Sequence, residues 1–371
     1  MEQTPLGQTP LGQTPLGQTP LGQAPLGQTP LGQAPLGQTP LGQAPLGRGG
    51  PEVSRAGLGL MGMSGIYGEA DDAESIATIR AALDAGITLL DTGDFYGMGR
   101  SEMLLRDALR GVPRDSVFIQ VKFGGQRDPQ GAFVGFDASP AAVKNFLAYS
   151  LRRLGTDYVD LYQPARLDPD VPIEDTVGAV AEMIEAGFVR CVGLSEVGAE
   201  TIRRAHAVHP ISALQIEYSL MSRSIEAEIL PVVRELGIGV TAYGILSRGL
   251  LSPETARLAP GDPRARFPRF TGGNLEHNLG LLGALEKLAR ERGVTTAQLA
   301  IAWVVAQGSD IVPLIGTKRR TRLAEALAAF DLDLTPAELA AIEAAVPADS
   351  VAGDRYDLHS MAALDSERRR P

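Results

Sequence analysis

From residue 50 onwards, short apolar runs alternate with longer segments in which apolar residues recur every three or four positions. Short runs rich in β-branched residues are typical of buried strands, and the longer spacing is typical of amphipathic helices. The predicted strands are Ala56–Met61, Ile87–Asp91, Val117–Lys122, Tyr158–Gln163, Val189–Ser195, Ala213–Glu217, Ile238–Tyr243 and Ile311–Ile315. The predicted helices lie at 72–86, 101–111, 139–155, 173–187, 198–207, 224–237, 296–308, 319–330 and 336–346.

Capping residues support several of these helices. Ser139 precedes a proline, which is a typical N-cap followed by proline at the first helical position. Thr335 repeats this arrangement, and Glu338 completes a capping box. Eight strands, each followed by a helix, in about 300 residues predict an α/β fold of the (β/α)8 TIM barrel type. A doubly wound sheet is the main alternative.

The N-terminus has a different pattern. Nine copies of a five-residue unit, TPLGQ or APLGQ, end at Arg48. One proline and one glycine per unit are incompatible with a helix or a central strand, and one leucine per unit is too little to bury. We therefore expect a disordered repeat tail at 1–48, a barrel at 49–347 and a C-terminal tail at 348–371. Deletion of residues 2–43 should leave folding and activity unchanged.

Composition narrows the possible functions. The chain has 371 residues, 44% of them hydrophobic, and a net charge of −10, so we expect a sizeable core and no binding of nucleic acid. It contains no apolar run of about 18 residues and no secretory signal pattern, so no membrane association is expected. The single cysteine, Cys191, fits a reducing, cytoplasmic environment. Four scattered histidines provide no metal-ligand spacing.

Residues Arg248–Leu275 show neither helical nor strand periodicity. They are rich in Pro, Gly and Arg, so we expect a long functional loop such as a lid.

Residues Gly57–Gly62 match the pattern GxGxxG. A dinucleotide-binding fingerprint needs a helix that begins at its third glycine, and none is predicted before residue 71. In a barrel, these glycines would let a flat ring approach the backbone.

The strongest candidate for chemistry is the stretch DTGDFYGMGRSE, from Asp91 to Glu102. Active sites of (β/α)8 barrels lie at the C-terminal ends of the strands, where Asp91, Tyr96 and Lys122 converge. A nearby ammonium lowers the pKa of a phenol, and a carboxylate keeps that ammonium charged. Such a phenol can give a proton to a developing alkoxide. A buried lysine–aspartate pair beside a packed tyrosine remains the structural alternative.

A basic segment, Gly316–Arg322, joins the last predicted strand to its helix. Several cations at a helix N-terminus form an anion site. An ordinary solvated helix start is the alternative.

The chain resembles the aldo-keto reductase family from about Pro45 to about Pro347. The matching segments are PEVSRAGLGLMG, DTGDFYGMGRSE, VKFGG, VDLYQPARLDP, VRCVGLSE, LQIEYSLMSR, AYGILSRGLL and PLIGTKRR. The resemblance implies a (β/α)8 barrel and NADPH-dependent reduction of a carbonyl substrate, with NADP(H) as cofactor. It implies that Tyr96 is the proton donor and that Asp91 and Lys122 tune it. The implied cofactor-binding residues are Met61, Gly62, Asp91, Ser195, Glu196, Gln215, Tyr243, Ser247, Arg248, Gly249, Leu250, Gly316, Thr317, Lys318, Arg322 and Glu325.

The sequence departs from the family pattern at one catalytic position. The family's fourth catalytic residue is a histidine, and Ala165 occupies its place here. Members resembling pyridoxal reductases carry a similar segment, so pyridoxal and other small aldehydes are candidate substrates. A substrate that brings its own orienting group, or a water molecule, would replace the imidazole. The alternative function is an NADPH-binding sensor or regulatory subunit with weak catalysis.

Overall fold

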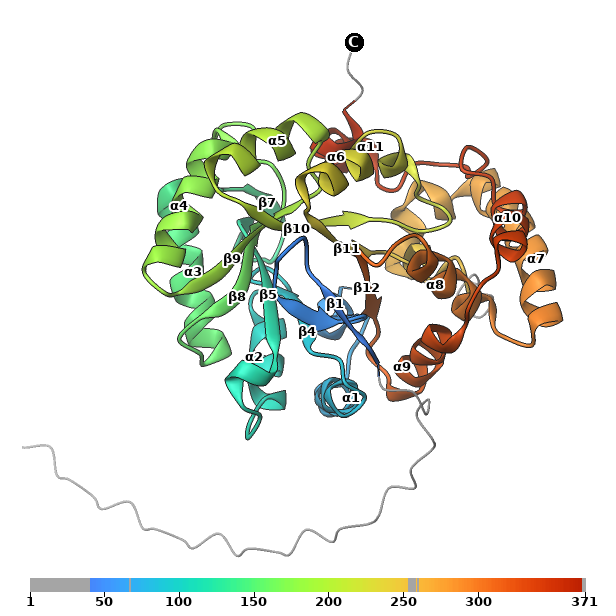
Figure 1. Cartoon of the computed structure of the whole chain (residues 1–371), viewed down its shortest axis with the longest axis horizontal. Coiled ribbons are helices and arrows are strands. Elements are labelled where there is room, and N and C mark those ends of the chain that lie inside the picture. Colours follow the sequence, from blue (N-terminus) through green and yellow to red (C-terminus); the bar gives the residue numbers. More distant parts are fainter. Residues whose placement is uncertain (1–40, 67, 253–257, 259, 369–371) are drawn as a thin grey trace, which may run out of the picture. The chain divides into compact units, whose positions relative to one another are not determined.

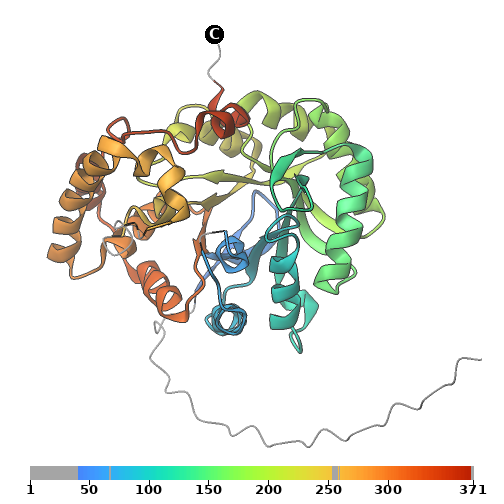
Figure 2. The same ribbon diagram turned by 180° about the vertical axis from the view of Figure 1, so that it is seen from behind.

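Eight parallel strands form a closed barrel surrounded by helices (Figures 1 and 2). The computed structural model describes residues 41–66, 68–252, 258 and 260–368. The barrel strands are β3 (Gly57–Gly59), β4 (Leu89–Gly93), β5 (Phe118–Phe123), β8 (Val159–Pro164), β9 (Val189–Ser195), β10 (Ile211–Glu217), β11 (Gly239–Tyr243) and β12 (Ile311–Gly316). Strand β12 pairs with β3 and closes the barrel. The predicted barrel is confirmed, and the doubly wound sheet is wrong.

The helices of the barrel occur close to their predicted positions. They are α1 (Asp72–Asp84), α2 (Arg100–Ala108), α3 (Pro140–Leu154), α4 (Ile173–Glu185), α5 (Ala199–Val208), α6 (Ile229–Leu236), α8 (Thr296–Ala306), α9 (Arg320–Leu327) and α10 (Pro336–Ala345). The side chains of Ser139 and Thr335 accept N–H bonds from Ala142 and Glu338, as predicted for N-caps. The predicted helix at 224–237 is divided into a 3-10 turn at Ser224–Glu226 and helix α6.

The N-terminal end of the barrel is closed by a hairpin. Strand β1 (Gln43–Pro45) pairs antiparallel with β2 (Glu52–Ser54). Between them, Leu46 is fully buried and packs against apolar side chains of the barrel interior, including Leu89 and Leu161. The predicted boundary of the tail at residue 48 is therefore wrong, because the last repeat copy is part of the folded domain. Residues 1–40, which hold the other copies, lie outside the described residues.

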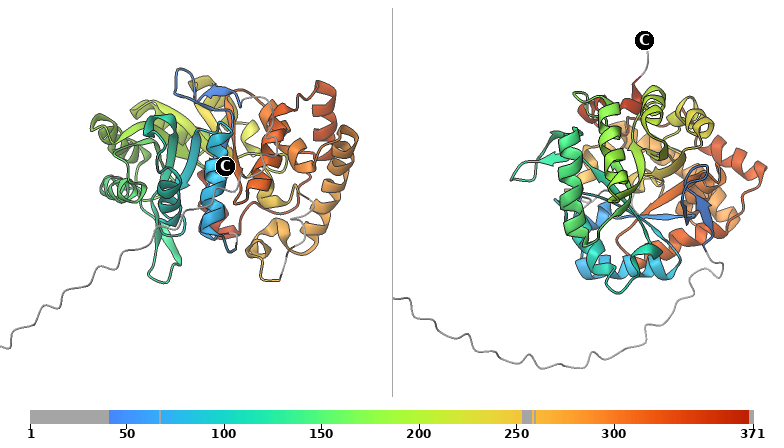
Figure 3. Two further views of the ribbon diagram at one scale, coloured as in Figure 1. Left: turned by 90° about the horizontal axis from the view of Figure 1, so that it is seen from below. Right: turned by 60° about the vertical axis from the view of Figure 1, so that its left-hand side comes forward.

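The C-terminal end of the barrel carries two further additions. A hairpin of β6 (Gly125–Arg127) and β7 (Phe133–Phe136) projects there, at the opposite end from β1 and β2 (Figure 3). The chain after residue 347 packs back onto the barrel, and its helix α11 (Leu358–Ala362) lies beside α5 and α6 (Figure 1). Arg355 and Leu364 of this segment are 5% and 1% exposed. The predicted C-terminal tail is thus an integral part of the domain over its described residues.

The segment Arg248–Leu275 is more ordered than predicted. Its described parts form 3-10 turns at Ser247–Gly249, Pro263–Arg266 and Pro268–Phe270, while residues 253–257 and 259 lie outside the described residues. A long helix, α7 (Gly272–Arg292), follows. No helix was predicted there because four glycines within α7 weaken its helical signal.

The GxGxxG stretch has a packing role. A 3-10 turn at Met61–Ser64 follows β3, and α1 begins only at Asp72. A Cβ atom on Gly57 would lie 2.4 Å from Leu89 and 2.5 Å from Leu314, so glycine is needed to fit inside the barrel. The dinucleotide fingerprint is therefore wrong. None of the helices in the described part of the chain is long and apolar enough to cross a membrane.

Candidate active site

The centre of the candidate site is the carboxylate of Asp91 on β4. Its Oδ1 accepts hydrogen bonds from Lys122 Nζ at 2.5 Å and from Gln215 Nε2 at 2.8 Å. Gln120 Nε2 is a longer third donor at 3.4 Å. These side chains come from three strands and point into the barrel, because alternate residues of each strand face the interior. The structure therefore brings Asp91 and Lys122 together, as predicted, and adds Gln215, which the resemblance assigns to cofactor binding.

Tyr96 lies in the loop that follows β4. Its side chain is 6% exposed, and Lys122 Nζ lies 5.1 Å from the centre of its ring. The loop turns sharply at Gly97 and Gly99, which have φ angles of 56° and 91° that favour glycine. Burial lowers the pKa of Lys122, although the charge of Asp91 opposes that shift. A buried ammonium with a depressed pKa beside a phenol is an arrangement suited to proton transfer.

Ala165 lies at the C-terminal end of β8. It is 1% exposed, and its N–H donates to the carbonyl of Phe123 at 2.8 Å, so the parallel ladder continues through it. Asp168 accepts an N–H bond from Ala138 at 2.9 Å and shapes the loop that follows. His206 lies in the last turn of α5 and accepts an N–H bond from Ile211 at the start of β10, and His209 caps that helix. Both therefore lie at the opposite end of the barrel from this mouth. Neither replaces the imidazole expected at position 165.

A second carboxyl group, Asp94, is buried behind the tyrosine loop. Burial raises its pKa to about 7, and the nearby charge of Glu102 adds to the shift. Its Oδ2 accepts an N–H bond from Gly124 at 3.3 Å, and its Oδ1 has no partner among the described residues. Glu102 is itself fully buried and ion-paired with Arg153. Asp94 therefore changes charge near neutral pH, two residues from Tyr96.

Two neighbouring residues end β9 in different environments. The hydroxyl of Ser195 is fully buried and has no hydrogen-bond partner among the described residues. Glu196 instead accepts bonds from Arg355 Nη1 at 3.0 Å and Nη2 at 2.9 Å, and from Ser366 Oγ at 2.6 Å. Burial opposes its ionisation, but the charges of Arg355 and Arg166 outweigh that cost and hold the pKa of Glu196 well below its usual range.

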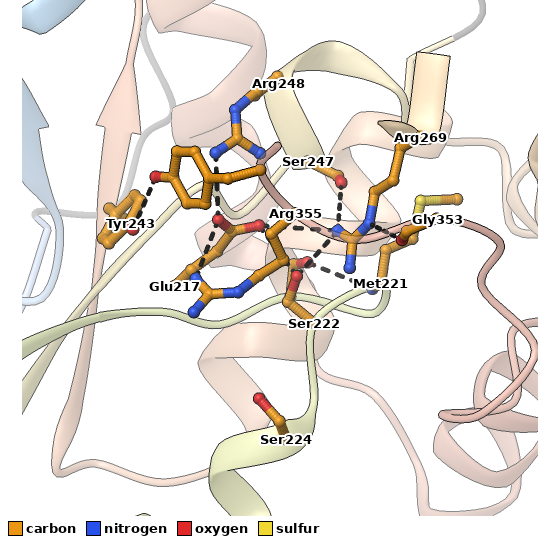
Figure 4. A network of polar contacts seen from close by, with 12 residues as sticks. Glu217, Met221, Ser222, Ser224, Tyr243, Ser247, Arg248, Arg269, Gly353 and Arg355 are labelled. Carbon is orange, nitrogen blue, oxygen red and sulfur yellow. Dashed lines mark hydrogen bonds and ion pairs between the residues drawn. The ribbon is translucent and has the colours of Figure 1, made fainter. Parts of the chain in front are cut away.

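Glu217, at the end of β10, is the centre of a buried ionic network that includes three guanidinium groups (Figure 4). Its carboxylate lies 3.2 Å from Arg355, 3.4 Å from Arg248 and 3.7 Å from Arg269. Burial opposes ionisation of Glu217, but these three charges lower its pKa. Arg269 also donates to Ser247 Oγ at 3.1 Å. The network connects the predicted cofactor loop to the C-terminal segment.

Tyr243, at the end of β11, joins the same network. Its hydroxyl donates to Glu196 at 2.7 Å and lies 3.0 Å from the hydroxyl of Tyr356. Burial raises the pKa of Tyr243 well above its usual range, and the charge of Glu196 adds to this shift. The guanidinium of Arg248 lies 4.3 Å from the centre of the Tyr356 ring. The C-terminal segment thus contacts Tyr243 and Glu196, two of the implied cofactor-binding residues.

Backbone strain is concentrated at this mouth. In the described part of the chain, the non-glycine residues with positive φ are Met98 at 55°, Glu196 at 54°, Ser247 at 47° and Arg248 at 55°. All four lie in loops that the sequence analysis assigned to the site. Strained backbone of this kind clusters at ligand-binding and active sites.

The predicted phosphate-binding segment follows β12. Lys318 Nζ contacts the carbonyls of Gly68 and Glu69, and Arg322 pairs with Glu325 at 2.7 Å. Arg322 and Glu325 also line a pocket of about 350 Å³ with residues of α7 and α8. That volume lies at the lower end of the range for small-molecule sites. The structure therefore brings Arg322 and Glu325, two of the implied cofactor-binding residues, to one cavity.

Several residues at this mouth were not singled out in the sequence. Glu217, Arg269 and Arg355 are buried charged residues of the network. Glu217 follows Gln215 by two positions on the same strand face, so the period of the strand was a usable signal. Arg269 and Arg355 lie in segments without periodicity, and no sequence signal marks them. Among the described residues, no cluster of His, Cys, Asp and Glu is arranged to hold a metal ion.

A lysine, a carboxylate and a tyrosine at the mouth of a (β/α)8 barrel form a candidate site for proton transfer. Comparison with known proteins identifies the class as an oxidoreductase that acts on carbonyl or CH–OH groups. The model of the "Aldo/keto reductase family" matches residues 55–347. A protein of Glycine max named "Probable aldo-keto reductase 1" is 41% identical over 314 residues, which cover 83% of this chain and 89% of that protein.

Solved structures give the same result. The glycerol dehydrogenase of Gluconobacter oxydans superposes with a TM-score of 0.74 at 30% identity, covering 82% of this chain and 94% of that one. A thermostable aldo-keto reductase in complex with the inhibitor epalrestat superposes with a TM-score of 0.66 at 27% identity, covering 82% and 99%. The chain belongs to the aldo/keto reductase family, whose general reaction is NAD(P)H-dependent carbonyl reduction.

Proposed function

We propose that this protein is a cytoplasmic, NADPH-dependent reductase of small aldehydes or ketones, with pyridoxal among the candidate substrates. The observation that carries the proposal is the contact between Lys122 and Asp91, buried in the barrel beneath Tyr96. Burying two charged groups costs desolvation free energy. This pair lies beside Tyr96, where a nearby positive charge favours the phenolate. The lone cysteine is consistent with a reducing compartment.

The mechanism follows from these three side chains. NADPH held by the cofactor-binding residues would supply the hydride for the carbonyl carbon. Tyr96 donates its phenolic proton to the carbonyl oxygen as negative charge develops there. Lys122 stabilises the phenolate that remains, and Asp91 holds the ammonium in position through the 2.5 Å contact. Gln215 also donates to Asp91. It therefore connects these three side chains with the part of the site proposed for the nicotinamide.

The residues of the site suit both the nicotinamide end and the adenosine end of the cofactor. The buried hydroxyl of Ser195, which lacks a protein partner among the described residues, is available to the carboxamide group. At the other end, Thr317, Lys318 and Arg322 are suited to a 2′-phosphate, because charge-assisted hydrogen bonds favour a phosphate over a hydroxyl. Arg322 and Glu325 line the adjacent pocket, which suits the adenosine. Met61, Gly62, Gly249, Leu250 and Gly316 remain in the proposed cofactor site.

The test is NADPH oxidation with a panel of aldehydes, pyridoxal included, by the wild type and by Tyr96→Phe. We expect turnover to fall by 10²–10⁴-fold in the variant while NADPH binding persists. Tyr149→Phe is the matched control, because that tyrosine is 58% exposed and lies on α3. Tight NADPH binding with negligible turnover in both proteins would instead support the sensor function that Ala165 raised.

A further inference from the structure

Gln163 lies directly beneath the position of the missing histidine. It precedes Ala165 by two residues on β8, and it follows Leu161, which packs in the barrel interior. Because side chains alternate along a strand, these three residues face the barrel interior one above the other. Gln163 is also the register partner of Lys122 on β5. Its side chain therefore starts at the level of the catalytic lysine.

The amide of Gln163 is buried without hydrogen bonds. Gln163 is fully buried, and neither Oε1 nor Nε2 has a partner among the described residues. The neighbouring strand accommodates this side chain, because a Cβ atom on Gly193 would lie 2.7 Å from Oε1. Buried amides are nearly always hydrogen-bonded, and an unpaired one is costly. An unpaired buried amide beside an active site is therefore a candidate to bind a water molecule or a ligand there.

We propose that Gln163 takes over the hydrogen-bonding task of the absent imidazole. In this role, which rests on the proposed function, its Nε2 donates to the carbonyl oxygen of the substrate, directly or through one water molecule. Ala165 leaves the path open, since its side chain is a single methyl group above the amide. The N–H bond holds the oxygen where Tyr96 can protonate it, and it stabilises the developing alkoxide. No covalent bond to Gln163 forms or breaks.

The proposal predicts opposite effects on activity and stability. Methionine matches glutamine in length and cannot donate a hydrogen bond, so Gln163→Met removes the amide with little change in volume. We expect kcat for aldehyde reduction to fall by about 10²-fold. The dissociation constant of NADPH should stay unchanged, and the thermal midpoint should stay equal or rise, because a buried unpaired polar group is gone. Leu161→Met, on the same strand face, is the matched control.

Rescue by an imidazole completes the test. Adding Ala165→His to Gln163→Met should restore kcat to within about tenfold of the wild type, because the imidazole supplies the missing donor. A purely structural role for Gln163 predicts a lower thermal midpoint, weaker NADPH binding and no rescue. Wild-type kcat in Gln163→Met, or failure of the rescue, overturns the proposal while carbonyl reduction by the wild type still stands. Absence of turnover in the wild type itself overturns the proposed function and this role with it.

Discussion

Arg355 and Glu196 form a bidentate ion pair, with Nη2–Oε2 and Nη1–Oε1 distances of 2.9 and 3.0 Å. The two side chains are 5% and 0% exposed. Their pairing fastens the C-terminal segment to the end of β9, beside the catalytic mouth. Because Arg355 also reaches Glu217, one guanidinium satisfies carboxylates at the ends of two barrel strands. The C-terminal segment is therefore a structural wall of the site.

Removal of this guanidinium should destabilise the domain. Arg355→Met leaves Glu196 and Glu217 buried with fewer charge partners, which costs about 3–5 kcal/mol of unfolding free energy. Urea unfolding followed by circular dichroism would measure the loss, and limited proteolysis should show earlier cleavage after residue 347. Arg368→Met is the control, because that side chain is 57% exposed and lies 3.8 Å from its ion-pair partner Asp365. Equal stability of the two variants would contradict this structural role.

Lys318 and Arg322 should determine the choice of cofactor. Replacing both with alanine removes the cations expected to meet the 2′-phosphate, so the Michaelis constant for NADPH should rise about 10–100-fold while that for NADH changes little. Steady-state kinetics with both cofactors measure the difference. Arg203→Ala is a suitable control, since its ion pair with Glu235 joins α5 to α6 far along the chain from this segment. A parallel rise for both cofactors would refute the assignment.

Asp94 should make stability depend on pH. Its folded pKa, about 7, is raised above the ordinary value of 3.8. Its stabilising contribution is therefore complete below pH 4 and is lost as the pH rises towards 7, because the folded protein holds a proton that the unfolded chain has released. Asp94→Asn removes this loss. The unfolding free energy of Asp94→Asn minus that of the wild type should therefore increase by about 3 kcal/mol from pH 5 to pH 8.

Urea unfolding of both proteins at several pH values would measure that growth. The charged and hydrogen-bonding groups around Asp94 are Glu102, Arg153, Lys122, Tyr162 and the N–H groups of Gly124 and Phe95. Asp115→Asn, at an exposed position, is the matched control. A difference between Asp94→Asn and the wild type that stays constant with pH would contradict the raised pKa of Asp94.

The N-terminal hairpin should be needed for stability, and the upstream repeat copies should be dispensable. Leu46→Ala empties a fully buried position and should lower the unfolding free energy by about 3 kcal/mol. Deletion of residues 2–40 should leave stability and turnover unchanged, since that cut precedes β1. Leu358→Ala, at a position 84% exposed, is the control. A large loss of stability in the deletion variant would overturn this prediction.

Much of the fold was predictable because barrel elements are repetitive and local. Each strand run carries its own apolar pattern, and each helix its own caps, as at Ser139 and Thr335. Helix α7 was not predicted because its glycines lower the local preference for a helix. Tertiary packing overrides that local preference. The repeat copy at residues 44–48 was placed in the tail because its sequence differs from the upstream APLGQ copies only in its last residue, Arg48. Its place in the folded domain depends on its pairing with β2, which no local pattern predicts.

The sequence by itself determined the barrel and the convergence of Asp91, Tyr96 and Lys122. The physical reason is that every parallel strand of a barrel ends at the same mouth, so residues at strand ends must meet there. Only the tertiary structure decided that Arg355 pairs with Glu196 and that the amide of Gln163 is left unpaired. Such pairings depend on how irregular segments fold over the mouth. They also depend on which donors and acceptors come within about 3 Å of one another, and local sequence periodicity predicts neither.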